Sequence, residues 1–202
     1  MKIIFDFDYT LYDTARFKEA LISALEELGP SREEIVRAYG AGQEYGEESY
    51  QPEAHVGRLG ESLRCSPGEA VMALEAVAKQ GTEFVYPGAA AFLRRLQQQG
   101  HTLVLLTLGD EGWQRLKVLN SGLADCFDAY YATAHPKTEM LPRLTADDEC
   151  VIVNDNGAEI EAMMAVCPSA RFVLKIGLKA IPPGLKIPVC RTFEEIEVAI
   201  LS

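Results

Sequence analysis

The pattern of hydrophobic and polar positions divides the chain into three parts. Residues 3–5, Ile-Ile-Phe, form a short apolar run that ends at Asp6, as expected for a buried parallel strand. Between residues 14 and 85, apolar positions recur at helical spacing and no strand pattern is clear. From Tyr86 onward, short apolar runs alternate with helical stretches, which predicts βαβ units and a parallel sheet.

Local signals place helix boundaries within the middle part. Apolar residues between 17 and 28 share one helical face, and a Gly-Pro pair then stops that helix. Ser31 with Glu34 three residues later predicts a capping box at the start of a second helix. Residues 66–69 begin another helix, whereas the glycine- and tyrosine-rich stretch 40–50 is expected to form a loop.

The third part supplies most of the predicted sheet. Expected strands lie at 103–106, 128–132, 150–153 and 172–174, and expected helices at 90–99, 111–119, 158–166 and 193–201. We therefore predict an α/β core, formed by residues 1–13 and 86–202, with a helical segment, residues 14–85, inserted after the first strand.

Two carboxylates, Asp6 and Asp8, follow the first strand. Acids at the end of a buried strand destabilise the fold unless they are paired, and Mg²⁺ prefers one or two carboxylates together with water and phosphate. An Asp carboxylate can also act as a nucleophile. A capped turn would be the simplest alternative. A calcium loop is excluded because its twelfth position, counted from Asp6, is Phe17 rather than Glu.

Polar residues also follow the later strands. Thr107 ends one apolar run, Asp155 follows another, and Lys137 lies between them in the sequence. Each alone has an ordinary explanation as a helix cap, a turn or a surface cation. Because parallel strands end at one edge of a sheet, where ligands bind, these residues and the Asp6–Asp8 pair are expected to meet there.

Composition excludes several classes of partner. The 202 residues carry a net charge of −11, which argues against electrostatic binding to nucleic acid or anionic membranes. The five cysteines are widely spaced without a Cys-x-x-Cys pair, as in a protein of the reducing cytoplasm. No signal peptide or membrane-spanning run is evident. The charge does not argue against a small phosphorylated metabolite as substrate, because a few local cations and a metal can offset its charge, and we expect a monomer or weak homodimer.

In order and spacing, these motifs resemble those of the haloacid dehalogenase (HAD) superfamily, the aspartate-nucleophile phosphohydrolases. Residues 6–11, Asp-Phe-Asp-Tyr-Thr-Leu, resemble the first motif, followed by Thr107, Lys137, and Asp155 with Glu159. The resemblance implies a Rossmann-like core with a helical cap over the site. It also implies a magnesium-dependent phosphohydrolase that cleaves a small phosphate monoester through an aspartyl-phosphate.

The resemblance also implies roles for the first motif and the metal site. Asp6 would attack phosphorus, and Asp8 would protonate the leaving oxygen and then activate water. Mg²⁺ would bind the Asp6 carboxylate, the Asp8 carbonyl and Asp155. Thr10 would fix the loop geometry, and Asn156 would support the site from outside.

Further roles follow for the later motifs. Thr107 and the Leu108 amide would bind a phosphate oxygen, and Lys137 would offset negative charge. Glu159 would hold metal-bound water or orient Lys137. In the cap, polar candidates for substrate contact are Tyr45, Tyr50, His55, Arg58 and Arg64, of which Arg58 is the first choice because a guanidinium suits anionic or hydroxyl-rich substrates.

The sequence departs from the common family pattern at four positions. Tyr9 and Asn154 replace glycines, Leu108 replaces Asn, and Glu159 replaces Asp, which leaves substrate range and metal geometry open. Alternatives to the phosphatase are a phosphomutase and a HAD-fold binding or regulatory protein with impaired catalysis. A dehalogenase is disfavoured by Asp8, because halide departure leaves no oxygen to protonate.

Overall fold

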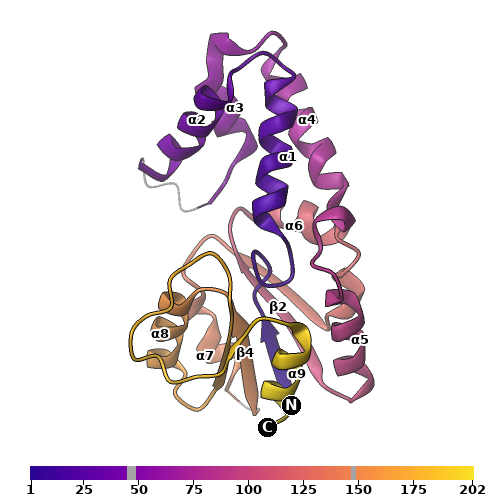
Figure 1. The fold of residues 1–202 in the computed structure, drawn as a ribbon, viewed down its shortest axis with the longest axis vertical. Helices are drawn as coiled ribbons and strands as arrows, with labels where there is room; N and C mark the ends of the chain where they lie inside the picture. The colour runs from indigo at the N-terminus through magenta and orange to yellow at the C-terminus, as the bar shows by residue number, and fades with distance from the viewer. Residues whose placement is uncertain (45–48, 147–148) are drawn as a thin grey trace.

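The computed structural model describes residues 1–44, 49–146 and 149–202, and it consists of a parallel sheet with helices on both faces and a helical projection beyond one end (Figure 1). The strands are β1 (Lys2–Phe5), β2 (Thr102–Leu108), β3 (Ala129–Thr133), β4 (Cys150–Asn154), β5 (Arg171–Lys175) and β6 (Val189–Cys190). Their order is β3-β2-β1-β4-β5-β6, and every pairing is parallel. The predicted α/β class and Rossmann-like core are confirmed.

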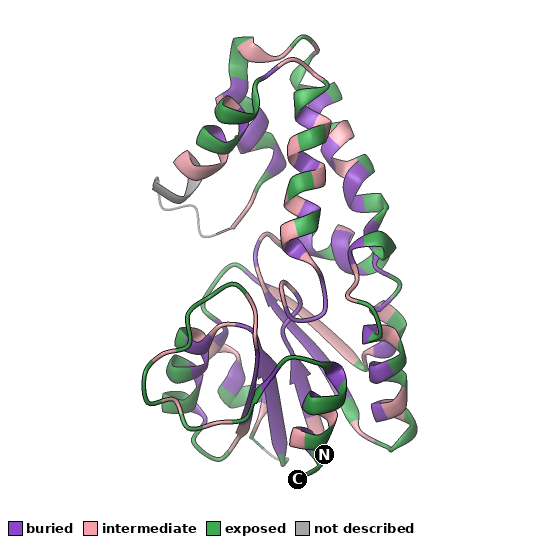
Figure 2. Ribbon diagram, viewed as in Figure 1, coloured by how far each residue is buried: buried purple, intermediate pink, exposed green. Residues whose placement is uncertain are grey.

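Alternation along β1 explains the layers of the core. Ile3 and Phe5 face α5 (Ala89–Gln98) and α9 (Phe193–Leu201), whereas Ile4 belongs to a second cluster with α7 (Leu141–Leu144) and α8 (Gly157–Val166). A strand covered on both faces must be apolar throughout, and Figure 2 shows the buried centre of the sheet.

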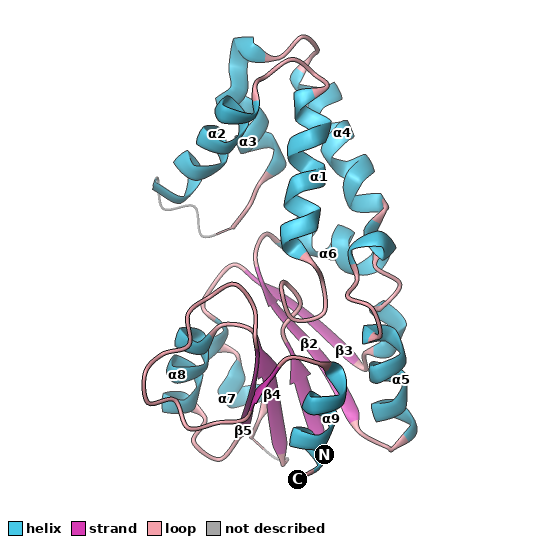
Figure 3. Cartoon of the chain, in the orientation of Figure 1, coloured by secondary structure: helices cyan, strands magenta, loops and turns pink. Residues whose placement is uncertain are grey.

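The projection is built from the helices that follow β1 (Figure 3). These are α1 (Thr14–Glu26), α2 (Arg32–Glu44), α3 (Pro52–Leu59) and α4 (Pro67–Lys79). The capping box predicted at Ser31 forms, since the Ser31 hydroxyl bonds the Glu34 carboxylate at 2.7 Å, and α4 starts at the predicted place with a second capping box between Ser66 and Glu69. The loop predicted over residues 40–50 is wrong in its first part, because α2 continues to Glu44 and tolerates Gly40.

The two chain crossings between sheet and projection are paired with each other. The Asp13 amide donates to the Phe84 carbonyl at 2.6 Å, and the Tyr86 amide donates to the Leu11 carbonyl at 3.0 Å. The Phe17 ring packs against Phe84 at a centroid distance of 5.2 Å. The projection is therefore held on its base by backbone bonds and aromatic packing.

The strands and helices predicted for the core begin and end within a few residues of their predicted positions. The short elements were not predicted: β6, α3 and α7, and the 3₁₀ turns Gly60–Ser62, Gly81–Phe84, Ala124–Cys126 and Lys137–Glu139. The division into a core and a mobile cap stays a prediction. In the described part of the chain, no helix combines the length and apolar character needed to cross a bilayer.

His55 joins the two outer helices of the projection. Its buried ring contacts the Ile35 carbonyl through Nε2 at 3.1 Å and the Tyr50 hydroxyl through Nδ1 at 3.0 Å. Burial lowers the pKa of His55 below its ordinary value near 6.5, and the nearby Arg58 charge acts in the same direction. The neutral imidazole is the form that the fold requires.

This burial predicts a pH-dependent stability. The unfolded chain takes up a proton on His55 at a higher pH than the folded chain, so the free energy of unfolding should fall as the pH drops below about 6.5. Urea titrations of the wild type and His55→Gln between pH 7.5 and 5 would measure it. We expect the difference in free energy of unfolding between the two proteins to become smaller as the pH falls. A constant difference would contradict the assignment.

Candidate active site

The carboxyl ends of three central strands bring the predicted chemical groups to one edge of the sheet. Asp6 follows β1 directly, Thr107 lies near the end of β2, and Asp155 follows β4. The Asp6 amide donates to the Val153 carbonyl at 2.9 Å, which extends the β1–β4 pairing to this residue. The register therefore fixes Asp6 beside the loop that carries Asp155.

Asp6 is held by two side chains from different parts of the chain. Lys137 Nζ lies 2.6 Å from Asp6 Oδ1, and the Thr10 hydroxyl donates to Asp6 Oδ2 at 3.0 Å. Burial raises the pKa of Asp6, and the Lys137 charge opposes that rise. Both carboxylate oxygens thus have fixed directions, and the Thr10 contact ties the first loop to Asp6.

Glu159 positions Lys137 through the other side of its ammonium. The Lys137 Nζ to Glu159 Oε2 distance is 3.1 Å, and the Asn154 amide donates to the same oxygen at 2.5 Å. Burial disfavours the charged form of Lys137, yet Asp6 and Glu159 together raise its pKa. Of the two roles predicted for Glu159, the contacts support the orientation of Lys137. Asn156 caps α8, since its side chain accepts the Glu159 amide.

Two buried oxygen atoms at this edge lack a hydrogen-bond partner within the described residues, Thr107 Oγ1 and Asp155 Oδ2. Burial and the charge of Asp6 raise the pKa of Asp155 to about 7. A hydroxyl and a carboxylate left unpaired in this way suit a phosphate oxygen and a cation respectively. Both are residues that the sequence nominated.

The donor set at the edge fits Mg²⁺. No cluster of three or more Asp, Glu, His or Cys side chains that could hold a metal exists in the described ranges. Mg²⁺ does not need one, because it binds through one or two carboxylates and keeps several waters. Asp6 and Asp155 supply those carboxylates, and the raised pKa of Asp155 indicates a carboxylate that a cation would stabilise.

Asp8 is bound by residues that sequence reasoning missed. Helix α6 (Glu111–Asn120) supplies Lys117, 2.5 Å from Asp8 Oδ1, and Gln114, 2.9 Å from Asp8 Oδ2. The Thr14 hydroxyl donates to Oδ1 at 2.5 Å. Burial alone would raise the pKa of Asp8, but Lys117, Thr14 and Gln114 lower it. The sequence held one signal for Lys117: it lies one helical turn after Trp113 and therefore on the same, buried face of α6.

Backbone conformation at two loop residues allows these contacts. Gly109 has φ 149°, and a Cβ there would lie 2.7 Å from Gln114 Nε2, so a larger residue would displace the Gln114 amide from Asp8. Tyr9 has φ 59°, which is unusual for a residue with a side chain. Its carbonyl accepts from Lys175 at 2.9 Å, and its amide donates to the Tyr12 carbonyl at 2.9 Å. The replacement of glycine by Tyr9 is therefore accommodated in a left-handed turn.

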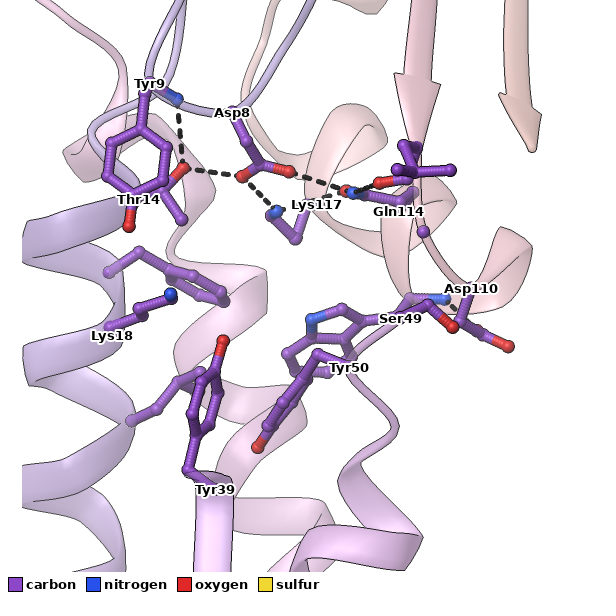
Figure 4. A pocket seen from close by; sticks show the side chains of 15 residues that line it. Asp8, Tyr9, Thr14, Lys18, Tyr39, Ser49, Tyr50, Asp110, Gln114 and Lys117 are labelled. Atoms are coloured by element: carbon purple, nitrogen blue, oxygen red, sulfur yellow. Dashed lines mark hydrogen bonds and ion pairs between the residues drawn. The ribbon is translucent and has the colours of Figure 1, made fainter. Parts of the chain in front are cut away.

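A pocket of about 260 Å³ opens from Asp8 toward the helical projection (Figure 4). Its lining residues come from the first loop, α1, α2, the residues before α3, the end of β2, the β2–α6 connection and α6: Asp8, Tyr9, Thr14, Phe17, Lys18, Leu21, Tyr39, Ser49, Tyr50, Leu108, Gly109, Asp110, Trp113, Gln114 and Lys117. Leu108 and Tyr50, both nominated from the sequence, lie in this wall. The projection and the core thus share one cavity.

Arg58, the first choice for a substrate contact, is not among the described residues that line this pocket, and its role as a substrate contact stays a prediction. Its Nε donates to the Ala38 carbonyl at 2.7 Å, and Arg58 lines a separate hollow with Glu34 and Arg37. Arg58 consequently joins α3 to α2 rather than facing Asp8. Of the other cap candidates, His55 is a buried packing residue, the Arg64 side chain lies against Gly29, and Tyr45 falls outside the described residues.

The fold matches that of several solved structures. A Burkholderia xenovorans LB400 protein assigned to the haloacid dehalogenase-like hydrolases superposes with a TM-score of 0.75 at 21% identity, over 99% of this chain and 98% of that one. YfnB from Bacillus subtilis, assigned as a HAD hydrolase and bound to magnesium, superposes with a TM-score of 0.71 at 16% identity, over 98% of this chain and 96% of that one. The L-2-haloacid dehalogenase of Xanthobacter autotrophicus superposes with a TM-score of 0.68 at 17% identity, over 100% of this chain and 98% of that one.

Sequence comparison identifies the family independently of these folds. Among curated proteins, none matches the chain significantly. The family model for haloacid dehalogenase-like hydrolases matches residues 3–166, a span that contains Asp6, Asp8, Thr107, Lys137 and Asp155. This chain belongs to the haloacid dehalogenase-like hydrolase family.

Proposed function

We propose that this hydrolase is a magnesium-dependent phosphatase that cleaves a small-molecule phosphate monoester through Asp6. The observation that carries the proposal is that the two carboxylates, Asp6 and Asp8, lie in different surroundings. Asp6 is buried against Lys137, whereas Asp8 faces the pocket that would hold the leaving group. A phosphate ester needs both a nucleophile and a group that manages the leaving oxygen's proton.

In the first step, an Asp6 oxygen would form a bond to phosphorus while the bond from phosphorus to the ester oxygen breaks. Lys137 offsets the charge gathered at Asp6, and Thr107 Oγ1 is free to donate to a phosphate oxygen. Bound Mg²⁺, held by Asp6 and Asp155, would supply further neutralisation of phosphate charge. The leaving oxygen would take a proton from the Asp8–Lys117 pair.

In the second step, water would attack phosphorus and release Asp6. The ionised Asp8 carboxylate is the form that accepts the proton of that water, and the proton returns to the Asp8–Lys117 pair. Lys117 is the cationic donor bound to Asp8, and Gln114 contacts both residues through its side-chain amide. The proton balance therefore closes over the two steps without another titratable group.

Dehalogenation is the alternative that the comparisons raise, since some of the similar structures are L-2-haloacid dehalogenases. Halide leaves without a proton, so that reaction gives no reason for Asp8 to be bound by three side chains at the pocket mouth.

All five cysteines are unpaired, which supports our further proposal that the enzyme works in the reducing cytoplasm.

Replacement of the nucleophile should abolish turnover without unfolding the protein. Asp6→Asn is isosteric and leaves Lys137 paired with Glu159, so we expect the fold to persist and nearly all hydrolysis of 4-nitrophenyl phosphate to disappear. The exposed acid Asp125, changed to Asn, is the matched control and should retain wild-type rates. Substantial hydrolysis by the Asp6 variant would refute the covalent route.

Loss of the unpaired carboxylate should weaken metal binding directly. Asp155→Ala should lower Mg²⁺ affinity in isothermal titration calorimetry and raise the Mg²⁺ concentration needed for activity. Glu159→Gln, which acts through Lys137, should cost about tenfold to hundredfold in rate with a smaller change in affinity. An unaltered affinity in Asp155→Ala would show that the ion binds elsewhere.

The proton role of Lys117 predicts a dependence on the leaving group. Lys117→Met should slow an alkyl phosphate by about a hundredfold, because alkoxide departs poorly without a proton. The same variant should change 4-nitrophenyl phosphate much less, since nitrophenolate leaves unprotonated. That second substrate also reports whether the site has folded. Equal losses on both substrates would assign Lys117 a structural role instead.

A further inference from the structure

Among the described residues, the pocket above Asp8 is lined by aromatic side chains and by one lysine, Lys18, that has no carboxylate partner. Figure 4 shows Tyr39 and Tyr50 in its wall. Trp113 also lines the pocket, and its ring centroid lies 5.5 Å from that of Tyr50. The rings pack against one another, with Tyr39 and Tyr50 stacked at a centroid distance of 5.3 Å, so they present an aromatic surface to the pocket that favours aromatic or other apolar groups. This region lies on the Asp8 side of the site, where the alcohol part of a phosphate ester would extend.

Lys18 projects from α1 into this space (Figure 4). Its ammonium lies 4.9 Å from the Tyr39 ring centroid and 5.8 Å from the Tyr9 ring centroid. Over the ranges that the structure describes, Lys18 has no carboxylate partner, in contrast to Lys117 and Lys137. Ring faces attract a cation but do not cancel its charge, so Lys18 remains able to pair with an anion.

The electrostatic balance of the pocket limits which anion fits. Of the residues that the structure describes, two acids line it, Asp8 and Asp110; Asp8 pairs with Lys117, and Asp110 caps α6 by accepting the Trp113 amide at 2.8 Å. Lys18 can balance one further negative charge. A carboxylate carries one, whereas a second phosphate carries nearly two at neutral pH and would leave an excess beside Asp8 and Asp110.

The strained backbone of Tyr9 supports a role for this wall. A tyrosine with φ 59° is held against its intrinsic preference, which the surrounding structure must offset. Its ring borders the pocket and lies near Lys18. A strained residue that shapes a cavity is more readily explained by ligand fit than by folding.

We propose that the substrate's alcohol part combines a flat, preferably aromatic, group with a carboxylate, and that Lys18 binds this carboxylate. Lys18 would then determine specificity from the helical projection, while the phosphate site remains on the core. The inference rests on the proposed phosphatase function for the identity of the ester. The carboxylate preference of the pocket can be tested without any reaction.

The kinetic test uses two esters that differ only in charge, 4-carboxyphenyl phosphate and 4-carbamoylphenyl phosphate. Lys18→Met removes the charge and keeps the stem, so kcat/KM should fall about tenfold for the carboxylate and less than about twofold for the amide. Lys18→Arg should restore most of the loss. The matched control is Lys79→Met, an exposed lysine paired with Glu75 on α4, which should change neither value. Equal effects of Lys18→Met on both esters, or no effect on either, would overturn the inference.

The binding test uses the corresponding alcohols, 4-hydroxybenzoate and 4-hydroxybenzamide. Trp113 is the only tryptophan of the chain and lines the pocket, so its fluorescence reports occupancy. The wild type should bind the benzoate about tenfold more tightly, and Lys18→Met should abolish that preference. A wild-type protein without the preference would overturn the inference. If the preference exists but neither ester is hydrolysed, the phosphatase proposal fails and the carboxylate site stands.

Discussion

The structure depends on how it compensates the negative charge that the parallel sheet gathers at one edge. Asp6, Asp8, Asp155 and Glu159 converge there, and buried carboxylates are costly unless they are paired. Two lysines, each about 4% exposed in its side chain, provide most of the compensation: Lys137 between Asp6 and Glu159, and Lys117 at Asp8. Asp155 Oδ2 has no hydrogen-bond partner among the described residues, and burial together with the charge of Asp6 raises the pKa of Asp155.

The same contacts connect the helical projection to the chemistry. Thr14 is the first residue of α1 and bonds Asp8 directly, while Phe17, one turn later, packs against Trp113 with ring centroids 6.0 Å apart. A movement of α1 would therefore alter both the surroundings of Asp8 and the wall of the pocket. In the proposed mechanism, substrate selection by the projection and proton transfer at Asp8 would therefore be coupled through α1.

Local patterns in the sequence were sufficient for most of the fold. The apolar runs 103–106 and 150–153 identify β2 and β4, because strands buried on both faces must be continuous in hydrophobicity. The two-residue strand β6 has no such run, and Gly40 obscured the continuation of α2, since tertiary packing overrode its low helix propensity.

The candidate site was predictable where it follows strand ends and not where it depends on helix orientation. Asp6, Thr107 and Asp155 could be placed together because parallel strands share an edge. Lys117 and Lys18 are single cations on helices, and only the packing of α6 and α1 shows that they face Asp8 and the pocket. Arg58 was chosen by residue type alone, which carries no information about direction.

The most direct test of the central claim is the mass of the enzyme during turnover. The protein would be mixed rapidly with Mg²⁺ and a phosphate monoester, quenched in acid, and digested for mass spectrometry of the peptide that contains Asp6. The account predicts a transient gain of one phosphoryl group, located on Asp6. Steady hydrolysis without that adduct, or an adduct formed instead from a 2-haloacid with release of halide, would contradict it.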